Sequence, residues 1–217
     1  MTSPPSIAQI TLVTGAARSG KSEWAEALAV QSGQSVIYVA TAQADAQDVE
    51  WQARILLHQQ RRPATWQTMM VPIALAATLQ AAKPSECLLV DSLGTWLANL
   101  LDQSDSEWQQ TVAELLLSVS QMRAQVIFVA EETGWGVVPA YPIGRLFRDR
   151  LGSLTRQIGA IAHPVYLVTG GHALNLSQLG TPLDVALPKI LDRPQRISEK
   201  SDLRPELPPK SPNSGGL

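Results

Sequence analysis

The sequence predicts an α/β fold in which a mostly parallel β-sheet is covered by helices on both faces. Short β-branched runs alternate along the chain with stretches of helical spacing, which is the pattern of an α/β protein. The strand-like runs SVIYVA, CLLVD and VIFVA are almost continuously apolar. Strands of this kind bury both faces, so the sheet must lie between two layers of helices.

Each element is expected from its own stretch of pattern. A first strand at residues 7–14 runs into a glycine-rich loop, which is followed by a helix at 21–31 and a second strand at 35–40. The further elements are expected, in order, as helices at 48–60 and 73–82, a strand at 87–91, helices at 94–101 and 107–122, a strand at 126–130, a helix at 143–162 and a strand at 165–169. Residues around 172–176 are expected to add one antiparallel edge strand.

The length and the distribution of prolines predict one folded domain and a tail. The chain has 217 residues, of which 45% are hydrophobic, and this suffices for a single domain with a sizeable core. Seven of the 15 prolines fall after residue 180, and no aromatic residue occurs from residue 192 onward. Such a segment buries too little apolar surface to offset the entropy of ordering. We therefore expect a single domain over residues 1–180 and a Pro-rich, disordered tail over residues 181–217.

Composition argues against several classes of protein. Seventeen Lys and Arg residues against 19 Asp and Glu give a formal net charge of −2, whereas nucleic-acid-binding domains usually carry a basic excess. The single cysteine, Cys87, cannot form an internal disulfide, which fits a reducing compartment. There is no apolar run of membrane-spanning length and no basic stretch of a secretory signal at the N-terminus. We expect a cytoplasmic protein that binds neither nucleic acid nor membrane.

The glycine-rich loop has the sequence of a phosphate-binding P-loop. GAARSGKS at residues 15–22 matches G-x-x-x-x-G-K-[ST] between an expected strand and an expected helix. Gly15 and Gly20 allow the backbone to turn its N–H groups toward phosphates, Lys21 neutralises the β and γ oxygens, and Ser22 offers a hydroxyl to Mg²⁺. The motif predicts a nucleotide site, and for the doubly covered, mostly parallel sheet we expect a P-loop NTPase fold of the RecA-like type. Nucleotide contacts are expected from Gly15, Ala16, Ala17, Arg18, Ser19, Gly20, Lys21 and Ser22.

Asp91 is the candidate for the second metal ligand. It ends the apolar run CLLVD, and ligand-binding residues emerge at the carboxyl ends of strands in open α/β sheets. The alternative is that Asp91 only caps the helix that follows. Because the two roles are compatible, we expect Asp91 to contact the metal.

His58 is a candidate nucleophile. It lies near Arg54, Arg61 and Arg62, and an unprotonated imidazole among guanidinium groups could attack a phosphate while the arginines neutralise the developing charge. The alternative, favoured by composition alone, is an ordinary surface or packing histidine. The P-loop and the size of the chain by themselves indicate only a small-molecule kinase.

Five segments in order resemble one enzyme family. LVTGAARSGKSEWAEALA, VIYVATAQ, ARILLHQQRRPATW, LLVDSLGTWLANLL and GWGVVP…GRLFRDRLG are similar to segments of the bifunctional adenosylcobinamide kinase / adenosylcobinamide-phosphate guanylyltransferase family of cobalamin biosynthesis. The resemblance covers about residues 10–176.

The resemblance implies two reactions. The first moves the γ-phosphate of ATP or GTP to the aminopropanol hydroxyl of adenosylcobinamide, with Lys21, Ser22, Asp91 and Mg²⁺ at the phosphates. In the second, His58 attacks the α-phosphate of GTP, holds GMP as a phosphoramidate and passes it to the phosphorylated corrinoid. Further nucleotide contacts are implied at Ala40, Thr41, Ala42, Gln59, Gln60, Arg61 and Arg62. The resemblance also suggests a homotrimer, in which the site could be shared between subunits.

The chain departs from the family pattern at a few positions. Met70 stands where a glutamate is common, and Asp91 where some members have glutamate. Glu131 replaces the asparagine of an N-E-x-G segment, and Thr155-Arg156 replaces N-Q. These last changes could affect corrinoid binding or subunit contacts. Two other functions stay open: a monofunctional kinase with a structural His58, and a regulatory nucleotide-binding protein without catalysis.

Overall fold

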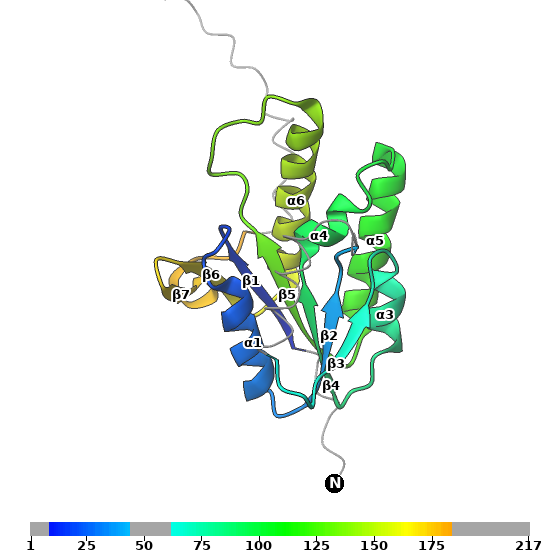
Figure 1. Ribbon diagram of the computed structural model, residues 1–217, viewed down its shortest axis with the longest axis vertical. Helices are drawn as coiled ribbons and strands as arrows, with labels where there is room; N and C mark the ends of the chain where they lie inside the picture. The colour runs from blue at the N-terminus through cyan, green and yellow to red at the C-terminus, as the bar shows by residue number, and fades with distance from the viewer. Residues whose placement is uncertain (1–8, 44–61, 184–217) are drawn as a thin grey trace, which may run out of the picture. The chain divides into compact units, whose positions relative to one another are not determined.

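A computed structural model describes residues 9–43 and 62–183 of the chain (Figure 1). Within these residues a seven-stranded sheet has the strand order β3-β2-β4-β5-β1-β6-β7. Every pairing is parallel except that of β6 with β7. The predicted α/β class, the mostly parallel sheet and the antiparallel edge strand are therefore confirmed. The strand β5 lies between β1, which leads into the glycine-rich loop, and β4, which ends at Asp91.

The strands are β1 (Ile10–Gly15), β2 (Ser35–Ala40), β3 (Gln67–Met70), β4 (Glu86–Asp91), β5 (Gln125–Glu131), β6 (Val165–Thr169) and β7 (His172–Asn175). The helices are α1 (Lys21–Gln31), α3 (Leu75–Ala81), α4 (Leu93–Ala98), α5 (Asp105–Gln121), α6 (Pro142–Ile161) and α7 (Leu176–Leu179).

Most predicted elements are present, with ends that shift by a few residues. The predicted ranges 21–31, 35–40 and 165–169 agree with α1, β2 and β6. Two elements, β3 and α7, are not predicted from the sequence. The strand β3 is a mostly exposed edge strand whose sequence, QTMM, contains one β-branched residue, and α7 is a single turn. The predicted helix at 48–60 lies outside the described residues, as does almost all of the predicted tail.

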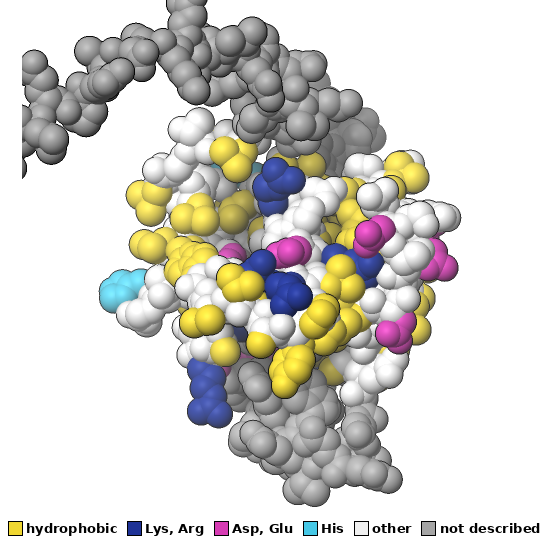
Figure 2. All heavy atoms as spheres, turned by 90° about the horizontal axis from the view of Figure 1, so that it is seen from above, with side chains coloured by type: hydrophobic (Ala, Val, Ile, Leu, Met, Phe, Trp, Pro, Cys, Tyr) yellow, Lys and Arg dark blue, Asp and Glu magenta, His cyan; other side chains and the backbone are white. Residues whose placement is uncertain are grey.

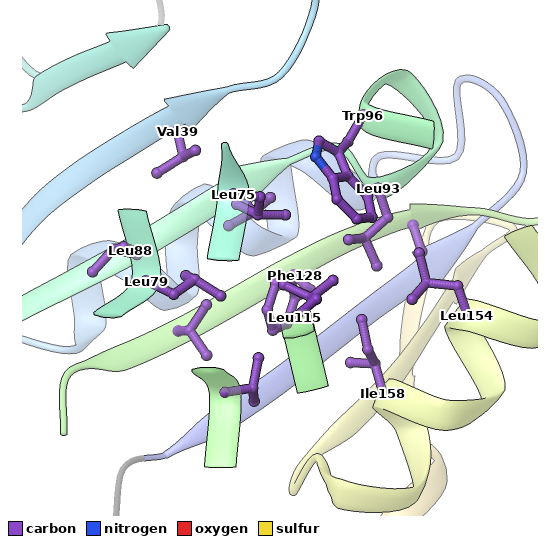
Figure 3. Packing of buried hydrophobic residues seen from close by; sticks show 14 of the residues in the cluster. Val39, Leu75, Leu79, Leu88, Leu93, Trp96, Leu115, Phe128, Leu154 and Ile158 are labelled. Carbon is purple, nitrogen blue, oxygen red and sulfur yellow. The ribbon is translucent and has the colours of Figure 1, made fainter. Parts of the chain in front are cut away.

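Helices cover both faces of the sheet, as the continuous apolar strands predict. Alternate strand residues point to opposite sides: Val39, Leu88 and Phe128 belong to one buried cluster, and Val36, Tyr38 and Leu89 belong to the other. The first cluster packs against α3, α4, α5 and α6, which Figure 3 shows through Leu75, Leu79, Leu93, Trp96, Leu115, Leu154 and Ile158. The second packs against α1. Because both faces of the sheet are packed against helices, the ends of the strands are held in place. Residues at these strand ends form the candidate site.

Local sequence signals set where several helices begin. Ser104 caps α5, and its side chain and that of Glu107 satisfy each other's backbone N–H groups in a capping box. Ser92 and Thr95 form the corresponding capping box at α4. Pro142 stands in the first turn of α6, where a missing N–H costs nothing. In the described part of the chain, none of the helices has the length and apolar character needed to cross a membrane.

Candidate active site

The P-loop connects β1 to α1, and its two glycines have identifiable roles. A Cβ on Gly15 would lie 2.5 Å from the carbonyl oxygen of Val168, so β6 can approach only a glycine here. Gly20 has a φ of +93°, in the left-handed region that favours glycine. As the N-cap of α1, Gly20 has no side chain to occupy the N–H groups of the first turn. These groups and the helix dipole are therefore directed at an anion, as the motif predicts.

Lys21 is the first residue of α1 and is largely buried, with 8% of its surface exposed. Its Nζ donates to the carbonyl oxygen of Ala16 in the same loop at 3.4 Å, a long hydrogen bond. A phosphate oxygen is a stronger acceptor than this carbonyl. Lys21 is therefore held inside the loop where a bound phosphate would be.

A cavity of about 400 Å³ opens beside Lys21 at the carboxyl ends of the central strands. We call it the P-loop cavity. In open α/β sheets this edge is the usual position of a ligand. The cavity is lined by Ala17, Lys21, Ser22, Tyr38, Ala40, Ala42, Arg62, Thr68, Met70, Asp91, Ser92, Gly94, Thr95, Ala98, Glu131 and Phe147. It thus gathers predicted site residues from the P-loop, from β2 and from β4.

Asp91 is held by Tyr38, a residue that no sequence motif marks as part of the site. The Tyr38 hydroxyl donates to Oδ2 of Asp91 at 2.8 Å, and the Arg62 guanidinium carbon lies 3.2 Å from the centre of the Tyr38 ring. Burial, followed by the nearby Asp91 charge, raises the pKa of Tyr38 well above its ordinary value. The hydroxyl therefore keeps its proton and remains a donor. The three residues form a unit that orients both a carboxylate and a cation in the P-loop cavity.

Ser92, and not Asp91, caps α4. The Ser92 hydroxyl accepts from the backbone N–H of Thr95, while Asp91 ends β4 and lines the cavity. The alternative reading of Asp91 as the helix cap is therefore wrong. Its carboxylate is available to the cavity, where Ser22 is the other predicted metal ligand.

Glu131, which the sequence identifies only as a departure from the family pattern, also belongs to the site. It ends β5, the strand between β1 and β4, level with Gly15 in the register. Its carboxylate accepts from the Ser92 hydroxyl and, at 3.0 Å, from the backbone N–H of Gly94. It therefore anchors the start of α4 and also lines the P-loop cavity.

The remaining predicted contacts divide into three groups. Ala40 and Ala42 line the P-loop cavity, as does Arg62. Thr41 does not: it is fully buried, and its hydroxyl is hydrogen-bonded to the backbone of Ser92 at 2.8 and 2.9 Å. His58, Gln59, Gln60 and Arg61 lie outside the described residues. Their roles stay predictions.

The departures from the family pattern fall in two places. Met70 lines the P-loop cavity, whereas Thr155 and Arg156 line a neighbouring cavity. Glu131 lines both. Residues separated by more than twenty positions are thus brought together by α6 and the end of β5.

The residues of the P-loop cavity fit a Mg²⁺ ion bound together with a nucleotide. Ser22 and Asp91 contribute oxygen atoms, the ligands that Mg²⁺ prefers. Among the described residues there is no group of three or more His, Cys, Asp or Glu side chains able to hold a metal. Two protein oxygens suit Mg²⁺, which commonly keeps waters and takes its other ligands from substrate phosphates.

Comparisons with known proteins agree with this site. The family model for cobinamide kinase / cobinamide phosphate guanyltransferase matches residues 11–176. The chain is 43% identical over 174 residues to a bifunctional adenosylcobalamin biosynthesis protein of Pseudomonas aeruginosa, covering 79% of this chain and 98% of that protein. It is 38% identical over 175 residues to the Escherichia coli K12 protein of the same description, covering 74% and 95%.

One solved structure, of a Pyrococcus horikoshii OT3 protein, has a TM-score of 0.49 and 9% identity over 81% of this chain and 88% of that one. The assignment does not need this likeness, because the family match spans β1 to the start of α7 and includes the P-loop and Asp91. The chain belongs to the cobinamide kinase / cobinamide phosphate guanyltransferase family.

Proposed function

We propose that this chain phosphorylates adenosylcobinamide with ATP or GTP and then transfers GMP from GTP to the product, which yields adenosylcobinamide-GDP. The observation that carries the proposal is the P-loop cavity of a family member, where Lys21, Ser22 and Asp91 meet at one edge of the sheet. The cavity is of a size suited to a small-molecule ligand.

The first reaction depends on positioning and electrostatics. The P-loop N–H groups and Lys21 bind the phosphates and offset the negative charge that spreads over the transferred group. Tyr38 keeps Asp91 in place through its hydrogen bond, and Arg62 adds a second cation. When bound, Mg²⁺ supplies charge neutralisation at the phosphates, with Ser22 and Asp91 as its protein ligands.

The second reaction uses His58 as the nucleophile. A bond forms between an imidazole nitrogen and the α-phosphorus of GTP, and the bond to the β-phosphate oxygen breaks, which releases pyrophosphate. A phosphate oxygen of the phosphorylated corrinoid then displaces the histidine and takes the GMP. Support comes from the family resemblance of the segment ARILLHQQRRPATW and from the position of Arg62, four residues after His58, in the P-loop cavity.

We further propose that the enzyme is cytoplasmic and that it is a homo-oligomer, with a trimer as the form that the resemblance suggests. Gel filtration with light scattering tests the oligomer directly. A monomer at micromolar concentration would contradict it.

The deciding experiment separates the two reactions. Wild type, His58→Ala and Lys21→Ala are incubated with α-labelled GTP, and separately with γ-labelled ATP and adenosylcobinamide. We expect acid-labile, base-stable label on the wild-type protein and none on His58→Ala, which keeps phosphorylating the corrinoid. Lys21→Ala should lose phosphorylation.

Other outcomes assign the alternatives. Phosphorylation without any protein label in the wild type would indicate a monofunctional kinase. Nucleotide binding without transfer in either assay would indicate a regulatory protein and refute the proposal.

A further inference from the structure

A second cavity, of about 350 Å³, lies beside the P-loop cavity. One wall is formed by Arg148, Gly152, Thr155 and Arg156. They share one face of α6 because Arg148 lies four residues before Gly152, and Thr155 and Arg156 lie three and four residues after it. The opposite wall is the end of β5 and the chain that follows it, residues 131–135. We call this the α6 cavity. In Figure 1, the connection from β5 to α6 arches away from the sheet before α6 begins.

The α6 cavity is structurally tied to the P-loop. The backbone N–H of Glu132 donates to the carbonyl oxygen of Gly15 at 2.9 Å, and the Thr14 hydroxyl donates to the Glu132 carboxylate at 2.7 Å. Glu131 lines both cavities. A group placed in the α6 cavity therefore lies next to the P-loop and beside the P-loop cavity.

A kinase must bring an acceptor hydroxyl in line with the γ-phosphate, from the side opposite the leaving nucleotide. We propose that the α6 cavity binds the amide-bearing arm of the corrinoid acceptor and directs its hydroxyl past Glu131 into the P-loop cavity. This inference rests on the proposed function and adds to it the location of the acceptor.

The polar groups of the α6 cavity suit primary and secondary amides, which both donate and accept hydrogen bonds. The carboxylates of Glu131 and Glu132 accept, and the exposed guanidinium of Arg156 donates. The half-buried Thr155 completes this wall of the cavity.

The size of the cavity limits what enters it. At about 350 Å³ it is near the lower end of small-molecule sites, which span about 300–1,000 Å³. It accommodates an arm of the acceptor but not a corrin macrocycle. Trp135 belongs to the lining and is 71% exposed, so a flat apolar surface is available where the macrocycle would remain outside. In the view of Figure 2, basic and acidic side chains meet near the centre of the face, with hydrophobic side chains around them.

The test fills the α6 cavity without touching the P-loop cavity. A Cβ on Gly152 would meet no atom within 4 Å, so Gly152→Leu places its side chain in open space on α6 and also improves helix propensity. The matched control is Ser153→Leu, which adds similar bulk on the same helix at an exposed position outside the cavity lining. The assay is phosphorylation of adenosylcobinamide with ATP, with KM measured separately for the corrinoid and for ATP.

We expect Gly152→Leu to raise KM for the corrinoid at least tenfold and to change KM for ATP less than twofold, while Ser153→Leu changes neither. A second variant, Trp135→Ala, should raise KM for the corrinoid about threefold or more, and it carries the test if Gly152→Leu is not obtained folded. Unchanged corrinoid KM in these variants would overturn the inference while leaving the proposed function intact. An increase confined to KM for ATP would overturn it too, by assigning the cavity to the nucleotide. No phosphorylation by the wild type would instead refute the proposed function.

Discussion

The hydrogen bond from Tyr38 to Asp91 gives the sharpest test of the site. In Tyr38→Phe the ring stays in place, so the packing in the buried cluster and the face beneath Arg62 are kept. Only the hydroxyl that donates to Oδ2 of Asp91 at 2.8 Å is removed. The substitution therefore isolates one charge-assisted hydrogen bond from the surrounding packing.

The expected loss follows from the position of this bond. Hydrogen bonds to charged groups contribute about 1.5–3 kcal/mol to stability. Asp91 is only half-buried and lines the P-loop cavity, so water can take the place of the lost hydroxyl. The loss should therefore be near the lower end, about 1.5 kcal/mol. At about 2–4 °C per kcal/mol for a domain of this size, Tm should fall by about 3–6 °C.

Two measurements check this prediction. Thermal unfolding gives the change in Tm, and corrinoid phosphorylation at saturating nucleotide should show kcat reduced about tenfold, because a freed Asp91 carboxylate samples several orientations. The control is Tyr166→Phe, a partly buried tyrosine that packs against the same cluster, contacts Trp24 and does not line the P-loop cavity. If neither Tyr38→Phe nor the control changes Tm or kcat, the hydrogen bond does not position Asp91.

Three further predictions concern other parts of the structure. Gly94→Ala should lower the free energy of unfolding, measured by urea unfolding, by about 1–2 kcal/mol, because the added Cβ displaces the Glu131 carboxylate from its two hydrogen bonds. In a Glu131→Ala background the same substitution should instead stabilise α4, because alanine has the higher helix propensity. Ser104→Ala should cost about 1 kcal/mol in the same assay by removing the capping box of α5. Ser106→Ala, two residues further on in the first turn, should cost less than half of this. Burial raises the pKa of Cys87 to about 11, so the native state holds the thiol proton more tightly than the unfolded chain does. The contribution of this protonated thiol to the free energy of unfolding is complete below about pH 8.5 and is lost as the pH rises toward 11. Urea unfolding from pH 8 to pH 11 should show a shallower decline in Cys87→Ala, and an identical slope would contradict the burial argument.

The sequence carried enough information for the elements whose signals are local. The helix α1 begins at Lys21, directly after the second glycine of the P-loop motif. The strands β2 and β6 coincide with the β-branched runs SVIYVA and VYLVT. The edge strand β3 could not be found in this way. Its residues Gln67 to Met70 have little strand pattern and become a strand by pairing with β2 from Ile37 onward.

Tyr38 shows why part of the site escaped sequence reasoning. In the sequence it is one more apolar residue of SVIYVA, 53 positions before Asp91. In the sheet, β2 and β4 are neighbours, and the register pairs Tyr38 with Leu89. Asp91 is two residues further along β4 and so points to the same face of the sheet. A tyrosine side chain can span the diagonal distance between Tyr38 and Asp91 on neighbouring strands. The contact exists only because of this register.

The sequence by itself determined the class of fold, the phosphate-binding loop and the family, because each of these is written in contiguous segments whose chemistry is local. Only the tertiary structure decided which residues surround the phosphates: it placed β5 between β1 and β4, and with it Glu131 between two cavities. In that structure Ser92 caps α4, so the Asp91 carboxylate lines the P-loop cavity. Strand order and register are set by the packing of the whole sheet, and this packing chooses the neighbours of each side chain at the site.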